Sequence, residues 1–169
     1  MQRRWLTVAL VAAIALLVVA WSVGPAVLVG VVGPTTVDGD DGTVTVADGQ
    51  TGTVHGQVDV DVAETHAERV AGLSNVDHLP ADRGMLFVFD DEATRTFVMR
   101  EMAVDLDIVF VAANGTITEI HEARAPGPDE DGADLEYRGR AQLVLEVNRG
   151  WSADHGVTVG DRATVERAD

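Results

Sequence analysis

The chain of 169 residues contains no cysteine and no lysine, and only 5% of its residues are aromatic. Without cysteine it can form no disulfide, no thiolate metal site and no cysteine nucleophile. A low aromatic content in an acidic chain can indicate disorder. Regular patterns of Val, Leu, Ile and Phe nevertheless run through residues 53–165. We therefore expect a folded domain that is held together by its hydrophobic core alone.

Basic residues are also scarce, because 12 arginines stand against 28 acidic residues. Without Arg3 and Arg4, the remainder of the chain carries 10 arginines and a formal charge of −18. Such a surface repels nucleic acid and anionic lipid headgroups, which excludes nucleic acid as a partner. The composition is typical of proteins from salt-loving organisms, in which high ionic strength screens the self-repulsion. We interpret the acidity as an adaptation to solvation and not as a binding patch.

Residues 6–32 carry no charge and follow directly after Arg3 and Arg4. This run exceeds the ~20 residues that cross the ~30 Å hydrocarbon layer of a bilayer. A secretory signal peptide has a shorter apolar centre and a small-x-small cleavage site, whereas Gly24-Pro25 interrupts this run without such a pattern. We predict an uncleaved membrane anchor at residues 5–32, with a removed signal peptide as the alternative.

The two arginines before the anchor favour a cytoplasmic N-terminus. The sequence after the anchor is acidic and offers no competing basic cluster. We therefore expect a single-pass protein of the cell membrane with its C-terminal domain outside. Its predicted parts are a cytoplasmic tip at 1–4, the anchor at 5–32, a linker at 33–42 and an extracytoplasmic β domain at 43–167.

Short apolar or alternating segments, separated by turn signals, dominate the predicted β domain. Strands are expected at 43–47, 54–62, 85–89, 96–100, 107–113, 116–123, 141–148 and 162–166. Thr65 and Glu68 form a capping box for a short helix that Gly72 ends. A second short helix is expected at 151–155. This pattern predicts a mainly β domain, a compact antiparallel sandwich or barrel-like fold with two short helices, without βαβ alternation.

Five segments together have the order and spacing of one family: ERVAGL at 68–73, GMLFVF at 84–89, FVM at 97–99, LDIVF at 106–110 and VLE at 144–146. Over roughly residues 53–165 the chain resembles the domain-of-unknown-function family number 192, and looks like a membrane-anchored, archaeal, halophile-like member of it. The resemblance implies a small secreted or anchored β-sandwich with short helices, and it implies no activity. The motif residues to which we assign structural roles are Arg69, Gly72, Leu73, Gly84, Met85 and Glu146.

The chain departs from this family at one place that bears on a site. The family usually has a Trp before the methionine of the third segment and Lys-Asn after it. This chain has Val98, Arg100 and Glu101 at those positions. A family site that depends on the Trp or on the Lys-Asn pair would be altered here.

Asn114-Gly115 is the strongest hairpin signal in the chain. With a two-residue loop, Ala113 faces Thr116, Asp107 faces Glu122, and Ile108 faces His121. Opposed carboxylates repel each other unless a cation or a proton lies between them. Asp107 and Glu122 are therefore either an acid–base pair or half of a hard-cation site, or they are solvated and neutralised by Arg100 or Arg124. The candidate binding residues are Met99, Arg100, Asp107, His121 and Glu122.

The remaining polar residues give no established constellation. None of the five histidines has metal-ligand spacing, and we predict no metal and no cofactor. Ser74 and Ser152 lack the Gly-x-Ser-x-Gly elbow of hydrolases. Arg69 and Glu146 are charged members of apolar motifs, so they either form a buried ion pair or contact a ligand.

Three functions remain open. The first is a membrane-tethered extracytoplasmic module that binds or assembles an envelope component. The second is a hydrolase or metal-assisted enzyme that uses the carboxylate pair. The third is an accessory domain for another membrane protein, which the anchor would keep at high effective concentration.

Overall fold

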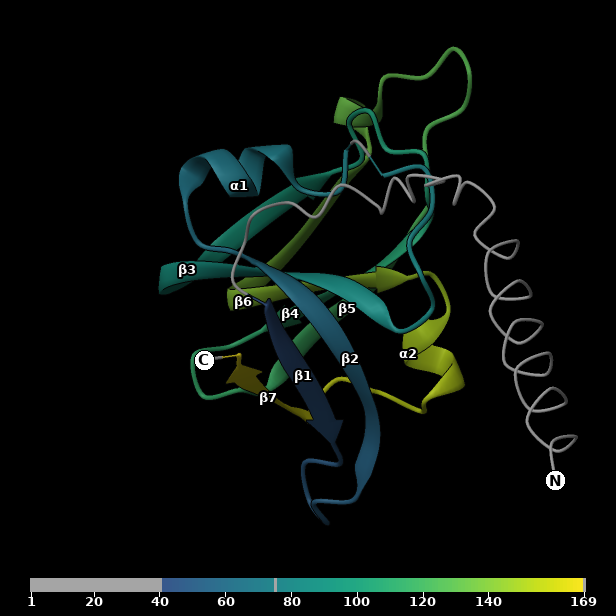
Figure 1. Ribbon diagram of the computed structural model, residues 1–169. Coiled ribbons are helices and arrows are strands. Elements are labelled where there is room, and N and C mark those ends of the chain that lie inside the picture. The colour runs from purple at the N-terminus through teal and green to yellow at the C-terminus, as the bar shows by residue number, and fades with distance from the viewer. Residues whose placement is uncertain (1–40, 75, 169) are drawn as a thin grey trace, which may run out of the picture. The chain divides into compact units, whose positions relative to one another are not determined.

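The computed structural model describes residues 41–74 and 76–168. These residues form a seven-stranded sheet with two short α-helices and one turn of 3₁₀ helix (Figure 1). The elements are β1 (Asp41–Ala47), β2 (Val54–Ala63), α1 (His66–Ala71), β3 (Arg83–Val98), β4 (Leu106–Val111), β5 (Ile117–Ala123), η1 (Gly132–Asp134), β6 (Glu136–Asn148), α2 (Trp151–Asp154) and β7 (Arg162–Arg167). The prediction of a mainly β fold with two short helices is confirmed.

The predicted membrane anchor at residues 5–32 lies outside the described residues. No helix within 41–74 and 76–168 has the length and apolar character needed to span a bilayer.

The strands lie in the order β5-β4-β6-β3-β2-β1-β7, and every neighbouring pair except one is antiparallel. The exception is β2 and β3, which run parallel and are joined through α1. A parallel pair needs a crossover connection, and here α1 lies within it. The predicted antiparallel pairing holds for the other strand pairs, and the expectation that the chain has no βαβ unit is wrong at this connection.

The two edge strands of the sheet, β5 and β7, meet at one end. Thr116 and Arg162 form an isolated antiparallel bridge. The Ile117 N–H donates to the Asp161 carbonyl, and the Ala163 N–H donates to the Gly115 carbonyl, both at 2.8 Å. The sheet therefore curls into a partly closed barrel at this end, which satisfies backbone groups that an open edge would leave unpaired.

Both faces of the central strands are buried. On β3, Leu86 belongs to a valine-rich cluster on one face, whereas Met85 and Phe87 belong to a second cluster, rich in Phe and Met, on the other. A strand covered on both sides reads as a continuous apolar run and not as an alternating one. The interpretation of 85–89 as a doubly buried strand is confirmed for Met85 to Phe87, and this strand continues past an irregularity into the segment predicted as a separate strand at 96–100.

The hairpin of β4 and β5 confirms the predicted register, because Asp107 faces Glu122 and Ile108 faces His121. The loop itself differs from the prediction. The Ala112 N–H donates to the Thr116 carbonyl at 2.9 Å, and Gly115 has a φ of 84°, which describes a three-residue loop. A register shift between Phe110 and Val111 compensates for the extra loop residue.

The capping box at α1 is confirmed in both directions. The Glu68 N–H donates to Thr65 Oγ1 at 3.2 Å, and the Thr65 N–H donates to Glu68 Oε2 at 2.8 Å. Gly72 ends the helix with a φ of 47°. None of the residues of α1 is buried, so its apolar contacts contribute little to the core. It lies beside β3 (Figure 1), and Arg69 on it donates to the Val88 carbonyl of that strand.

Candidate functional site

A cavity of about 480 Å³ lies between α1, β3 and the segment that follows β3. Its wall is apolar where β3 and the end of α1 contribute, and it carries charged groups from three elements. Its lining includes Arg69, Gly72, Phe87, Phe97, Arg100 and Glu146.

Glu146 on β6 is the buried acid of this cavity, with 5% of its surface exposed. Its cross-strand neighbours are Met85 on β3 and Ile108 on β4, and both are buried apolar residues. Burial raises the pKa of Glu146 from 4.5 to about 8, and no charged neighbour opposes the effect. At neutral pH this side chain is therefore mainly a neutral carboxylic acid.

The carboxyl group of Glu146 has no hydrogen-bond or ion-pair partner among the described residues. Its carboxyl oxygens are not completely enclosed by protein atoms, and Glu146 lines the cavity. Glu146 thus brings an unpaired hydrogen-bonding group to the wall of this cavity. Buried polar groups in folded proteins are normally hydrogen-bonded, so an unpaired one marks a candidate binding position.

Arg69 on α1 also lines the cavity. Its guanidinium donates to the carbonyl of Val88 at 2.9 Å and to the carbonyl of Glu64, and it lies over the Phe89 ring at 4.9 Å from the centroid. The structure contains no ion pair between Arg69 and Glu146. Of the two readings of these residues, the buried ion pair is therefore wrong, and both residues face a common cavity instead.

The segment after β3 supplies Arg100 and Glu101. The Met99 N–H donates to the Gly132 carbonyl at 3.0 Å, and Ser74 Oγ donates to the Arg100 carbonyl at 3.3 Å. The backbone is thus held on both sides, while the exposed Arg100 guanidinium has no partner among the described residues. Glu101 has a φ of 56°, a left-handed conformation that asparagine adopts more readily than glutamate.

The motif residues gather around Glu146. Met85 and Leu73 are buried in the cluster on this face of the sheet. Gly84 lies beside β6, where an added Cβ atom would stand 2.6 Å from the Glu146 carbonyl oxygen. Gly72 ends α1, and an added Cβ atom there would stand 3.5 Å from the Phe87 ring. These four residues therefore shape the backbone and the wall around the buried acid.

A family model, DUF192, described as "Uncharacterized ACR", matches residues 46–165.

The chain belongs to the DUF192 family. The family prediction is confirmed, and the match covers neither the predicted anchor nor the predicted linker. No curated protein matches the chain.

Two crystal structures are similar to this DUF192 domain. One is a protein of Sinorhizobium meliloti named "a putative transcription regulator", with 28% identity, a TM-score of 0.64, and coverage of 75% of this chain and 93% of that chain. The other is a protein of unknown function from Novosphingobium aromaticivorans, with 29% identity, a TM-score of 0.60, and coverage of 72% and 83%. Both similarities concern the fold and carry no assigned activity.

The predicted carboxylate pair does not share a site in this DUF192 domain. Asp107 is 1% exposed, and it accepts the backbone N–H groups of Gly150 at 3.0 Å and Ser152 at 2.8 Å. Glu122 is exposed and pairs with Arg149 at 3.1 Å. Backbone N–H groups, and not an arginine, thus stabilise the Asp107 carboxylate. In return, Asp107 fixes the start of α2.

The other candidates are divided between the cavity and its surroundings. Arg100 lines the cavity, and the neighbouring Met99 is buried in the cluster beneath it. His121 contacts the Arg138 carbonyl through Nε2 at 2.9 Å and lies edge-on to Phe110. Asp107, His121 and Glu122 are not part of the cavity wall. Arg100 therefore shares the cavity with two motif residues, Arg69 and Glu146. The spacing of these residues in the sequence did not predict that they meet.

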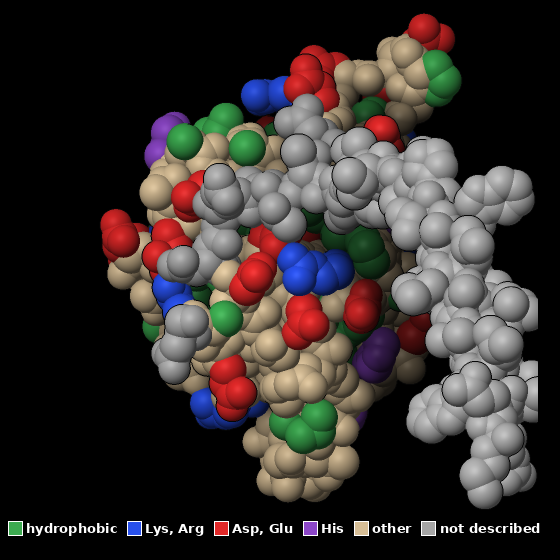
Figure 2. Space-filling model, viewed as in Figure 1, with side chains coloured by type: hydrophobic (Ala, Val, Ile, Leu, Met, Phe, Trp, Pro, Cys, Tyr) green, Lys and Arg blue, Asp and Glu red, His purple; other side chains and the backbone are tan. Residues whose placement is uncertain are grey.

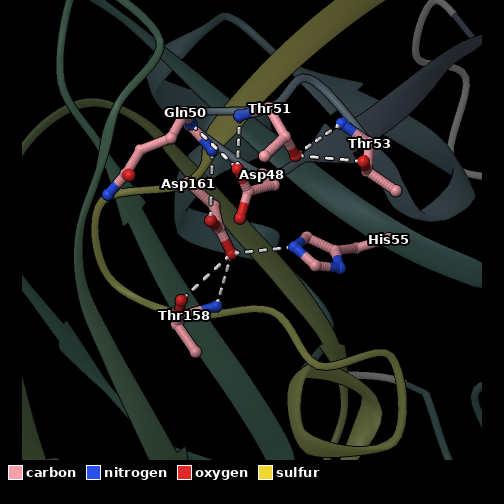
Figure 3. Close-up of polar contacts among 8 residues, drawn as sticks. Asp48, Gln50, Thr51, Thr53, His55, Thr158 and Asp161 are labelled. Carbon is pink, nitrogen blue, oxygen red and sulfur yellow. Dashed lines mark hydrogen bonds and ion pairs between the residues drawn. The ribbon is translucent and has the colours of Figure 1, made fainter.

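A second polar cluster was not predicted from the sequence. Ligand-type atoms of Asp48, His55 and Asp161 lie within 4.8 Å of one another (Figure 3). Asp48 accepts the N–H groups of Gln50 and Thr51, which lower its pKa, and Asp161 accepts the Thr158 N–H at 2.7 Å. Both aspartates are thus already used to fix turns. The residues come from distant segments, so no spacing in the sequence indicates the cluster.

Proposed function

We propose that this DUF192 domain is a binding module whose ligand occupies the cavity next to Glu146. The observation that carries the proposal is a buried carboxylic acid that has no partner in the protein and opens into a cavity. An unsatisfied buried polar group costs about 1–3 kcal/mol. A ligand that accepts a hydrogen bond from this acid would recover that free energy, which favours a binding role for the cavity.

We further propose that the domain works outside the cytoplasm, tethered to the membrane by residues 5–32. The uncharged run at 6–32, with Arg3 and Arg4 before it, supports the tether and its orientation. Acidic side chains are spread over the face in Figure 2, with few arginines among them, which is unfavourable for binding nucleic acid. The role suggested by the name of the Sinorhizobium protein therefore finds no support in this chain. An envelope component is the ligand source that fits the proposed location.

The alternative of a hydrolase that uses Asp107 with Glu122 loses its basis. Each of these carboxylates already has its own structural partners, and neither lines the cavity.

The tether can be tested by labelling, because the chain contains no cysteine. Asp129→Cys places a single thiol at an exposed position of the β domain, and Gln2→Cys places one before the proposed anchor. We expect a membrane-impermeant maleimide to label Asp129→Cys in intact cells and to label Gln2→Cys only after lysis. Labelling of the second variant alone in intact cells would reverse the orientation.

The pocket can be tested by filling it. Thr96 is exposed and lines the cavity, whereas Thr94 is exposed on the same strand and does not line it. Native mass spectrometry of the full chain, purified from its own membranes, should show a retained small molecule. We expect Thr96→Trp to lose this molecule and Thr94→Trp to keep it. Equal retention by both variants, or none by the unmodified chain, would contradict the proposal.

A further inference from the structure

Most arginines of the described residues form ion pairs with carboxylates, but a few do not. Ten arginines are described, and seven of them form ion pairs with Asp or Glu: Arg83, Arg95, Arg124, Arg138, Arg140, Arg149 and Arg167. The three that form none are Arg69, Arg100 and Arg162. In a chain with 28 acidic residues, carboxylates are plentiful, so an arginine without one needs a reason.

Two of these three arginines, Arg69 and Arg100, line the same cavity. Two carbonyl groups and the Phe89 ring orient the Arg69 guanidinium, and none of them neutralises its charge. Arg100 keeps its full set of donors available at the exposed side of the cavity. Guanidinium groups of this kind are suited to carboxylate or phosphate, with which they form paired hydrogen bonds.

The rest of the wall indicates what the ligand carries besides an anionic group. Phe87 and Phe97 pack edge to face with their ring centroids 4.9 Å apart, and both line the cavity. Leu73 adds a buried aliphatic side chain. Such a surface is favourable for an apolar body of the ligand and unfavourable for a small inorganic ion.

We propose that the cavity binds an organic anion, with its carboxylate or phosphate group at Arg69 and Arg100 and its apolar body against Phe87 and Phe97. This inference rests on the proposed binding function and specifies its ligand class. Glu146 in its protonated form donates a hydrogen bond to the ligand and places no negative charge beside it.

The charged groups around Glu146 decide how binding responds to pH. His66 and Arg69 line the cavity from α1, Arg100 and Glu101 line it from the segment after β3, and β3 itself contributes no titratable group. Burial holds the pKa of Glu146 at about 8, so the acid ionises as the pH rises above that value. The new charge repels an anion, and we expect anion affinity to be present below pH 8 and to fall above it.

Three probes of the same shape separate charge from apolar contact: 2-naphthoate, its uncharged analogue 2-naphthamide, and 2-naphthyl phosphate. Each is titrated calorimetrically into the full chain in detergent, with detergent alone as the blank. At pH 7 we expect 2-naphthoate or 2-naphthyl phosphate to bind about tenfold more tightly than 2-naphthamide. The stronger of the two anions identifies the preferred anionic group.

Matched variants assign this preference to the cavity. Arg100→Gln should remove the tenfold preference for the anion. Arg162 is the third arginine without a carboxylate partner, and it donates to the Asn114 carbonyl away from the cavity. Arg162→Gln removes the same charge and should leave the preference unchanged. The preference of the unmodified chain should shrink between pH 7 and pH 9.5, whereas that of Glu146→Gln should stay constant over this range.

The outcomes distinguish the two proposals. If the amide and the anions bind with equal affinity and Thr96→Trp abolishes this binding, the anion inference is wrong but the binding pocket is supported. A preference that Arg162→Gln removes as effectively as Arg100→Gln would also overturn it, because the effect would then reflect net charge alone. Absence of saturable binding for all three probes would overturn the anion inference alone, because the retained molecule in native mass spectrometry tests the pocket independently.

Discussion

The Asp107 carboxylate accepts a hydrogen bond from the Ser152 N–H at 2.8 Å, which ties β4 to the first turn of α2. Its other oxygen accepts the Gly150 N–H at 3.0 Å, so both oxygens are used in a buried place. The connection between a strand and a helix thus depends on a residue that the sequence alone presents as a candidate for catalysis.

Asp107→Asn should lower the free energy of unfolding by about 2–3 kcal/mol, because the amide NH₂ group replaces one of the two buried acceptors. Glu122→Gln, at the opposed exposed position, should change it by less than about 0.5 kcal/mol. Urea unfolding of the two variants measures both effects. A similar loss in both would indicate that the opposed carboxylates act as one unit.

Glu146→Gln should alter how stability depends on pH. The folded state holds the Glu146 proton up to about pH 8, whereas the ordinary pKa is 4.5. The contribution of this group to stability is therefore fully present below pH 4.5 and decreases as the pH rises to about 8.

The variant, which cannot ionise, should match the unmodified chain near pH 4.5 and exceed it above pH 8, by at most roughly 3–5 kcal/mol. Glu119→Gln, an exposed change of the same kind, serves as the control. Unfolding curves that stay parallel from pH 4.5 to pH 9 would show that Glu146 ionises normally.

Gly132→Ala should destabilise the domain by about 2 kcal/mol or more, since the added carbon would overlap backbone. Its Cβ atom would stand 2.1 Å from the Met99 carbonyl oxygen, directly before Arg100. Gly127→Ala, in the same connection between β5 and β6, meets only a flexible Glu130 oxygen at 3.8 Å and should be nearly neutral. Thermal unfolding distinguishes the two, and equal melting temperatures would mean that the Met99 segment yields freely.

Replacing Glu101 by Asn or Gly should stabilise the domain by about 0.5–1 kcal/mol, because these residues tolerate its φ of 56°. Glu101→Ala removes the same charge but keeps a Cβ atom, and it should not stabilise the domain. Chemical unfolding of the three variants separates the backbone effect from the charge effect. Equal gains in all three would assign the effect to charge.

Local features of this chain could be read from its sequence. The Thr65–Glu68 capping box and the facing of Asp107 and Glu122 both follow from residues that lie close together along the chain. The hairpin also shows the limit of such reasoning, since a three-residue loop and a compensating bulge replace the simple two-residue turn. Both arrangements give the same register over most of the hairpin, so the pattern of apolar residues cannot tell them apart.

The site could be predicted only in pieces. Arg69, Arg100 and Glu146 each attract notice in the sequence, but the spacing predicts nothing about which of them meet. The parallel pairing of β2 with β3 went unpredicted because α1 is a single short helix with little apolar surface of its own. That crossover is what carries Arg69 to the side of the sheet where Glu146 lies.

The local elements, the acidity and the family follow from residue type and from neighbours along the chain. The roles of Asp107, a structural acceptor, and of Glu146, a buried acid without a partner, depend instead on how the chain folds in three dimensions. The physical reason is that desolvation and hydrogen bonding depend on which groups are packed around a side chain in space. Segments far apart in the sequence supply those groups.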